Sequence, residues 1–398
     1  MRYALIIPDG AADDPGPGGN APSPLETAAL PHMRRLAGEG QIGLASHVPE
    51  GMAPGSEVAC LSLMGYDPRM LSGRAILEAA ALQTPVPEGG AVFRANLVSV
   101  RDGVMIDYSA GHIATPEARD LIERIEADHG QKGVTLRPGN SYRHLAVFEG
   151  MAGRLPSRAP PHDIMGQAVG LHDPEGEYAP RLLALEAASA SCLAKHHAGH
   201  PVAGTGRAHS ANATQLWLWG GAVPLKLEPF PARHGVTGAV IAAVDLMRGI
   251  GRLAGLETPR VRGATGYYDT NYAGKGQAAL EALRRHPFVC VHIEAPDEAS
   301  HNGDREAKAA ALEAIDREII GPLLAEADRA GDLRLLVCPD HPTPLAKRTH
   351  TAKPVPYARW GPGIGHNGGR LFSENEAMRI SGGAALEGTR LIHEWLAP

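Results

Sequence analysis

Apolar runs typical of β-strands lead directly into acidic and histidine residues at several points of this 398-residue chain. The carboxyl ends of neighbouring strands in an open α/β sheet meet at one edge, so side chains that follow those strands can gather there. Three such runs are Ala4–Pro8 before Asp9, Phe288–Ile293 before Asp297 and His301, and Leu333–Cys338 before Asp340 and His341. The pattern predicts an α/β fold with a functional site at one edge of the sheet.

The bulk composition excludes several kinds of partner. A hydrophobic content of 43% is ordinary for a globular chain, and a net charge of −6 gives no reason to expect nucleic acid or an acidic membrane surface. No apolar stretch approaches the about 20 residues of a membrane span, and Met1–Tyr3 leads into a strand rather than a signal peptide. The four cysteines form no C-x-x-C pair. We therefore expect a cytoplasmic protein with neither a nucleic-acid nor a membrane partner.

Strands alternate with helices at both ends of the chain, whereas the middle has short strand-like runs separated by loops rich in Pro, Gly and His. The alternating pattern is typical of a mostly parallel sheet covered by helices on both faces. We predict that residues 1–85 and 233–398 form one discontinuous α/β domain that carries the metal-type ligands. Residues 86–232 would form a smaller inserted α+β domain.

Two helices matter for placing the site. After Pro24 the spacing of Leu30, Met33 and Leu36 predicts one helix that ends at Gly38 and Gly40. A second helix is predicted to start near Ser56.

The acidic and histidine residues have the types and spacings of metal ligands. Asp297 and His301, at i and i+4, would share one face of a helix, and adjacent Asp340 and His341 can turn towards the same sheet edge. A single histidine of this kind is more often a surface residue, but the whole set, with Asp9 and His350, is large enough for two ions. Mixed nitrogen and oxygen ligands favour Mn²⁺ or Zn²⁺ over Ca²⁺.

Ser56 has two possible roles. As an N-cap it would contribute about 1 kcal/mol to its helix. As a nucleophile it would be activated by a metal ion, at a helix N-terminus that stabilises an anion. Spacing alone favours the cap, whereas the neighbouring ligand set favours the nucleophile.

Two ions and a serine at a helix start form an arrangement suited to phosphoryl transfer, in which basic side chains would hold the rest of an anionic substrate. Taken singly, each of these basic residues is more often a solvated surface charge. Arg143 with His144 stands out because the pair interrupts apolar sequence. The candidates are His112, Arg143, His144 and Arg94 in the predicted insert, and Arg248 and Lys275 outside it.

The chain resembles the archaeal-type 2,3-bisphosphoglycerate-independent phosphoglycerate mutases of the alkaline phosphatase superfamily over essentially its whole length. The residues that carry the resemblance are Pro8–Gly10, Ser23–Thr27, Leu30–Leu36, Pro54–Val58, Leu63–Pro68, Glu294–His301, Pro339–Pro344, Thr349–Thr351 and Pro354–Pro356.

The resemblance implies an alkaline-phosphatase-like sheet and a metallic cofactor of two divalent ions, without 2,3-bisphosphoglycerate. One ion would be held by Asp9, Ser56, Asp340 and His341, and the other by Asp297, His301 and His350. Ser56 would take the phosphoryl group from 3-phosphoglycerate and return it to the 2-hydroxyl of glycerate. The inserted domain would act as a lid that keeps water from the phosphoserine.

One segment departs from the family pattern. Leu71–Ala80 reads LSGRAILEAA, where the archaeal mutases usually have YTGRGPFEA. In this respect the chain is similar to a bacterial sub-branch for which a homoserine kinase role has been proposed. A kinase-like phosphotransferase, a phosphatase and a catalytically silent metal-binding scaffold therefore stay as alternatives to the mutase. The sequence leaves the oligomeric state open and allows a homo-oligomer.

Overall fold

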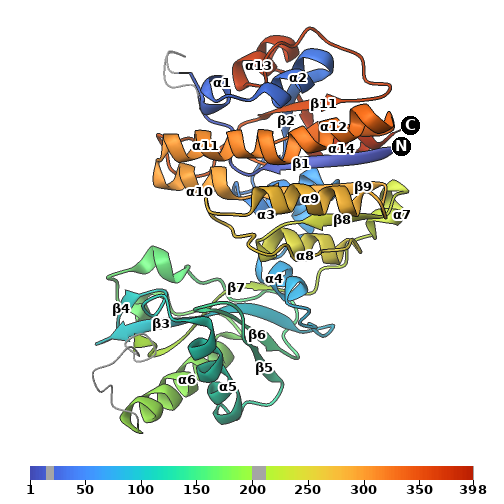
Figure 1. Cartoon of the computed structure of the whole chain (residues 1–398). Helices are drawn as coiled ribbons and strands as arrows, with labels where there is room; N and C mark the ends of the chain where they lie inside the picture. Colours follow the sequence, from blue (N-terminus) through green and yellow to red (C-terminus); the bar gives the residue numbers. More distant parts are fainter. Residues whose placement is uncertain (15–21, 200–211, 398) are drawn as a thin grey trace. The chain divides into compact units, whose positions relative to one another are not determined.

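The computed structural model describes residues 1–14, 22–199 and 212–397, and the chain divides into two compact units. One unit comprises Met1–Met70 with Leu227–Pro398, and the other comprises Leu71–Lys226 (Figure 1). The sequence pattern placed these boundaries at 86 and 232. The smaller unit begins earlier because helix α4 (Ala75–Ala81) packs on strands β3 and β7 of that unit.

The larger unit is built on a seven-stranded, mostly parallel sheet in the order β12-β2-β11-β10-β1-β9-β8. Strand β1 lies between β9 and β10 and is parallel to both, whereas β11 is antiparallel to its two neighbours. The sequence-based prediction of an α/β fold with a mostly parallel sheet is confirmed. The strands are β1 (Arg2–Pro8), β2 (Gln41–Ser46), β8 (Gly238–Ile241), β9 (Phe288–Ile293), β10 (Leu333–Val337), β11 (Val355–Trp360) and β12 (Ala385–Glu387).

Helices cover this sheet, with α9 and α12 packed on central strands and α14 and α8 on outer ones (Figure 1). The central strands are buried on both sides, which explains why their sequences are continuous apolar runs rather than alternating ones. The helices are α1 (Pro24–Thr27), α2 (Pro31–Glu39), α3 (Ser56–Leu63), α7 (Phe230–His234), α8 (Asp245–Leu253), α9 (Tyr272–Ala282), α10 (Ala295–Asn302), α11 (Arg305–Ile315), α12 (Gly321–Ala330), α13 (Glu374–Ser381) and α14 (Gly388–Leu396). A π-helical turn, Asp316–Ile320, joins α11 to α12, and a short 3₁₀ turn spans Pro68–Met70.

The single helix predicted after Pro24 is wrong, because the chain forms α1 and then α2 with a break before Pro31. Proline lacks the amide hydrogen that would continue the ladder, and its ring clashes with the carbonyl four residues earlier.

The smaller unit is an α+β structure around an antiparallel sheet, in which the long strand β3 pairs with β4, β6 and β7. Its core joins strand residues such as Phe93 and Phe148 to Ile122 of α5 and Leu185 of α6. Its remaining elements are β3 (Ala91–Arg101), β4 (Val104–Asp107), α5 (Thr115–Asp128), β5 (Val134–Arg137), β6 (Arg143–Phe148), α6 (Ala179–Gly199) and β7 (Gln215–Ala222), with 3₁₀ turns at Pro161–Ile164 and Val169–His172. Among the described residues, no helix has the length and apolar character needed to cross a bilayer.

Candidate active site

The predicted ligands gather at the carboxyl ends of the three central parallel strands. Asp9 follows β1, Asp340 follows β10, and Asp297 lies on α10, which begins directly after β9. Because β1 pairs with both β9 and β10 in parallel register, these strand ends meet at one edge.

The first group contains Asp9, Asp340 and His341, which offer ligand atoms within 4.8 Å of one another. The Nε2 atom of His341 lies 3.5 Å from Asp9 Oδ1 and 3.4 Å from Asp340 Oδ2. All three side chains are buried. Two carboxylates and one imidazole fit one divalent cation with mixed oxygen and nitrogen ligands.

Ser56 belongs to this first group. Its hydroxyl lies 3.4 Å from Asp9 Oδ2 and 3.2 Å from His341 Nε2. The residue that caps α3 is Gly55, and no side chain caps this helix, so the interpretation of Ser56 as an N-cap is wrong. Ser56 is instead the first residue of the helix, with its Oγ directed at the carboxylate and the imidazole.

The second group contains Asp297, His301 and His350, also within 4.8 Å of one another. Helix α10 carries Asp297 and His301, as the i, i+4 spacing predicted, and His301 Nε2 lies 3.1 Å from Asp297 Oδ2. His350 Nε2 lies 3.6 Å from Asp297 Oδ1 and 3.0 Å from His301 Nε2. Two imidazole nitrogens and a carboxylate at these distances fit a second cation.

Thr343 connects the two groups. Its hydroxyl lies 2.5 Å from Asp297 Oδ1 and 3.2 Å from His341 Nδ1, so it touches one member of each group. The carbonyl of Arg348 lies 3.0 Å from His301 Nδ1 and fixes the orientation of that ring. Such contacts leave the other ring nitrogen of each histidine facing its group, which is how metal-binding histidines are oriented.

The charges of the site need a cation to balance them. Burial and the nearby carboxylates of Asp340, Glu294 and Asp297 raise the pKa of Asp9 well above its usual value. Asp9 Oδ1 is buried and has no hydrogen-bond partner among the described residues. Buried carboxylates in contact are costly unless a positive charge compensates them, so this donor set fits divalent metal ions.

The second group is electrostatically different. Burial alone would raise the pKa of Asp297, but hydrogen bonds with His301 and His350 hold it well below the usual range. The same contact with Asp297 raises the pKa of His301 to about 9. One carboxylate thus faces two imidazoles in the second group, whereas the first group combines two carboxylates with one imidazole.

Some residues of the site escaped the sequence analysis. His292 lies within β9, inside an apolar run, and Cys60 lies on the buried face of α3. Both belong to further groups of metal-type ligands, Cys60 with His292 and Asp340, and Asp9 with His292 and Glu294. The alternation of side chains along a strand could have located His292. Val291 and Ile293 both pack into the core on one face of the sheet, so His292 between them points to the opposite face.

Three substrate-binding candidates of the smaller unit are associated with aromatic rings. The Arg94 guanidinium lies 4.0 Å from the Trp219 ring centroid and pairs with Glu78 at 3.1 Å. The Arg143 guanidinium lies 4.9 Å from the ring centroid of Tyr142, which the His112 ring contacts edge-on. Arg143 is exposed and can reach an anion.

The other three candidates are buried. His144 is 2% exposed, and its Nδ1 accepts a hydrogen bond of 3.0 Å from the Gly139 amide. Burial and the charge of Arg119 lower the pKa of His144 to about 3. In the larger unit, Lys275 donates to the carbonyl of His292 at 3.1 Å, and Arg248 pairs with Asp245 at 3.3 Å. His144 is not among the proposed substrate ligands, because its Nε2 is buried and its Nδ1 already accepts a hydrogen bond from Gly139.

The fold and the clustered ligands are those of an α/β enzyme whose chemistry lies at the carboxyl ends of its strands. A model of the 2,3-bisphosphoglycerate-independent phosphoglycerate mutase family matches residues 37–198. A relative from Geobacter sulfurreducens, named as a probable mutase of this kind, is 44% identical over 100% of both chains. A mutase of the same name from Methanothrix thermoacetophila is 42% identical, again over 100% of both chains. The chain belongs to the 2,3-bisphosphoglycerate-independent phosphoglycerate mutase family.

Solved structures agree with this fold. A protein from Pyrococcus horikoshii superposes with a TM-score of 0.81 at 25% identity, covering 99% of this chain and 96% of that one. The cofactor-independent phosphoglycerate mutase from Thermoplasma acidophilum superposes with a TM-score of 0.67 at 23% identity, covering 100% and 99%.

Proposed function

We propose that this protein is a cofactor-independent phosphoglycerate mutase that interconverts 3-phosphoglycerate and 2-phosphoglycerate through a phosphoserine at Ser56. The observation that carries the proposal is the position of the Ser56 hydroxyl, 3.4 Å from Asp9 Oδ2 and 3.2 Å from His341 Nε2 at the start of α3. The names of the relatives supply the substrate class.

Asp9, Ser56, Asp340 and His341 would hold one divalent ion, and Asp297, His301 and His350 would hold a second. When bound, these ions would lower the pKa of the serine hydroxyl and neutralise charge on the phosphoryl oxygens. Mn²⁺ and Zn²⁺ suit such ligands.

Ser56 would perform two transfers in sequence. In the first, a bond forms between its Oγ and phosphorus while the bond from phosphorus to the 3-oxygen of glycerate breaks. In the second, the 2-hydroxyl of the retained glycerate takes the phosphoryl group back. The dipole of α3, positive at its N-terminus, favours the negative charge that both transfers place there.

The smaller unit would hold the anionic ends of the substrate and exclude water, because an exposed phosphoserine would hydrolyse instead of returning its phosphoryl group. Arg143, Arg94 and His112 are the residues that we propose for this role. Outside that unit, Arg248 and Lys275 stay candidates for which burial favours a structural role.

A kinase-like phosphotransferase is the second candidate, and a specific observation supports it. The segment that departs from the family pattern includes the first part of α4, whose Glu78 pairs with Arg94 at 3.1 Å and with Arg74 at 3.4 Å. Arg74 and Glu78 match the family pattern, and the residues between them, Ala75–Leu77, depart from it. A helix with changed residues therefore carries the partner of a proposed substrate ligand, which is where a change of substrate would be expected.

Phosphorus NMR of two incubations tests these functions against each other. Metal-loaded enzyme is given 3-phosphoglycerate in one and homoserine with ATP in the other. We expect 2-phosphoglycerate in the first incubation only, and no product after chelation. Phosphohomoserine instead would establish the kinase, and inorganic phosphate alone would establish a phosphatase.

Two serine variants on the same helix test the nucleophile. Ser56→Ala should lose transfer while it keeps its fold and most of its metal. Ser62→Ala, which removes another buried hydroxyl of α3, should stay active. Undiminished turnover of Ser56→Ala would end the phosphoserine hypothesis.

A further inference from the structure

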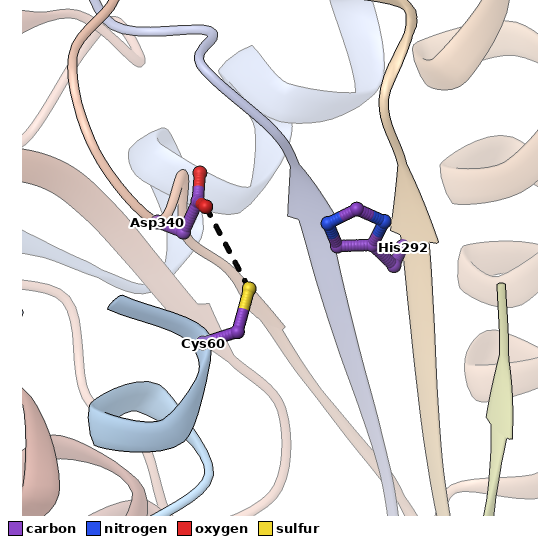
Figure 2. A group of neighbouring side chains, drawn as sticks. All are labelled: Cys60, His292 and Asp340. Atoms are coloured by element: carbon purple, nitrogen blue, oxygen red, sulfur yellow. Dashed lines mark hydrogen bonds between the residues drawn. The ribbon is translucent and has the colours of Figure 1, made fainter. Parts of the chain in front are cut away.

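Cys60, His292 and Asp340 come from three separate elements and meet on the side of the sheet that α3 covers. Each offers one ligand atom, and these atoms lie within 4.8 Å of one another. Figure 2 shows the His292 ring extending from β9 towards the Cys60 thiol and the Asp340 carboxylate. All three residues are buried.

The spacing within this group suits one ion. Cys60 Sγ lies 3.6 Å from Asp340 Oδ2 (Figure 2). A tetrahedral ion with a bond of about 2.3 Å to sulfur and about 2.1 Å to oxygen places those two ligand atoms about 3.6 Å apart. The thiol and the carboxylate are therefore already separated as two ligands of one such ion would be.

The third member of the group has an unused ligand atom. The side chain of His292 is 1% exposed, and its Nε2 has no hydrogen-bond partner among the described residues. This nitrogen lies 3.1 Å from Asp9 Oδ2, but not in the geometry of a hydrogen bond. Buried polar atoms are nearly always paired, so an imidazole nitrogen without a hydrogen bond, beside a thiol and a carboxylate, is suited to bind a cation.

We propose that Cys60, His292 and Asp340 form a further binding site for a borderline divalent cation such as Zn²⁺ or Co²⁺. The site shares Asp340 with the proposed Asp9 group and has a softer donor set, because a thiolate replaces oxygen. On binding, the sulfur–metal bond forms as the thiol proton leaves to solvent, and no electron is transferred.

The two sites share Asp340, but the proposed cation site does not rest on the proposed mutase activity, since neither Cys60 nor His292 has a role in the transfer. Its consequence concerns metal selection. A thiophilic ion would occupy Asp340 from the Cys60 side and compete with the ion proposed beside Ser56, so Zn²⁺ in excess would inhibit while Mn²⁺ in excess would not.

Cobalt titration of the full-length, chelator-stripped protein tests the site, because thiolate ligation of Co²⁺ gives a charge-transfer band in the near ultraviolet. The wild type should show this band, and Cys60→Ser should lose it. Cys290→Ser is the matched control, since Cys290 is a buried cysteine of β9. That variant should keep the band.

A second variant guards against a general effect of the Cys60 substitution on folding. His292→Gln keeps the thiol and should lower the affinity read from the band by at least about tenfold, since even changes outside the ligand shell cost that much. Circular dichroism should show both variants folded. A band that persists in Cys60→Ser, or no band in the wild type at saturating Co²⁺, would overturn the proposal. Ser56→Ala should keep the band, so either proposal can fail alone.

Discussion

Gly10 follows Asp9 with a φ of +61°, and its backbone packs directly against Asp297. A Cβ at this position would stand 2.7 Å from the Cβ of Asp297. The Gly10 amide also donates to Asp340 Oδ1 at 3.1 Å. One residue without a side chain thus lets carboxylates from three strand ends approach one another.

We predict that Gly10→Ala destabilises the protein by on the order of 2–4 kcal/mol, from left-handed backbone strain and overpacking combined. Urea unfolding measures the loss. Gly38→Ala on α2 is the control, because a Cβ there meets nothing within 4 Å, and that variant should be slightly stabilised. Equal stabilities of the two variants would contradict the close packing of Gly10 on Asp297.

Arg143 is the exposed cation that we expect to matter most for substrate affinity. Arg143→Ala should raise KM, lower kcat/KM by about one to two orders of magnitude, and increase hydrolysis relative to transfer, because a charge-assisted contact contributes roughly 1.5–3 kcal/mol. Steady-state kinetics check this, with the exposed Arg124 of α5 as control. Unchanged kinetics in Arg143→Ala would show that the residue only faces solvent.

His144 should make the stability of the smaller unit depend on pH. Its pKa of about 3 in the folded protein lies below the usual value of 6.5, so the unfolded chain binds more protons between these values. Stability is therefore complete above pH 6.5 and falls on acidification, by about 2 kcal/mol between pH 7 and pH 5. Urea unfolding followed by tryptophan fluorescence measures this difference. His144→Asn keeps an acceptor for the Gly139 amide but does not titrate, so this variant should lose less stability between pH 7 and pH 5. An equal loss of stability in the variant would show that His144 is not the group responsible.

At the scale of elements, the π-helical turn between α11 and α12 provides the cap that α2 lacks. No side chain caps α2 locally, and its first residue is Pro31. The buried Asp316 carboxylate accepts hydrogen bonds from the His32 and Met33 amides at 3.0 and 2.7 Å. A distant residue thus performs the function of an N-cap and links α2 to the π-helical turn between α11 and α12.

Asp316→Ala should lower the free energy of unfolding by about 1–3 kcal/mol, because buried amides lose their acceptor. Asp328→Ala is the matched control, since Asp328 also links α12 to α2, through Arg35 at 2.7 Å, but in an exposed ion pair. That change should cost less than about 1 kcal/mol. Urea midpoints compare the two, and a larger effect of Asp328→Ala would contradict the capping role.

Local sequence rules predicted the elements that depend on nearby residues. The i, i+4 spacing of Asp297 and His301 predicted that both lie on one helix, which is α10. The positions of Asp9 and Asp340 after apolar strands predicted that these two residues lie close together. The same rules failed where distant contacts decide. Asp316 lies far from α2 in the sequence, and His292 in an apolar run is indistinguishable by composition from a core histidine.

At the scale of the whole molecule, the smaller unit has its own hydrophobic core, and the two ends of its chain segment lie side by side. The Ser72 hydroxyl accepts from the Val223 amide at 3.0 Å, so the two ends of Leu71–Lys226 lie side by side. The sequence pattern placed the first boundary at 86 because the short strand-like runs, separated by loops rich in Pro, Gly and His, begin there. The packing of α4 on β3 and β7 assigns this helix to the smaller unit.

We predict that residues 71–226 expressed alone fold cooperatively. The reason is that adjacent chain ends impose no strain and the described residues of this unit form a hydrophobic core of their own. Urea unfolding should give coincident transitions by circular dichroism and by fluorescence of Trp217 and Trp219. A broad, non-coincident transition would show that this core needs the rest of the chain.

The central position of β1 has a consequence for biosynthesis. This strand leaves the ribosome long before its partners, which are Phe288–Ile293 on one side and Leu333–Val337 on the other. At about 5–20 residues per second, its hydrogen-bonding edges wait roughly 15 to 60 s for the first of them. Since an unpaired apolar strand is prone to aggregate, the nascent chain should need chaperone protection during that interval. The site itself can assemble only after His350 has been synthesised, so a translation product truncated before that residue cannot carry it.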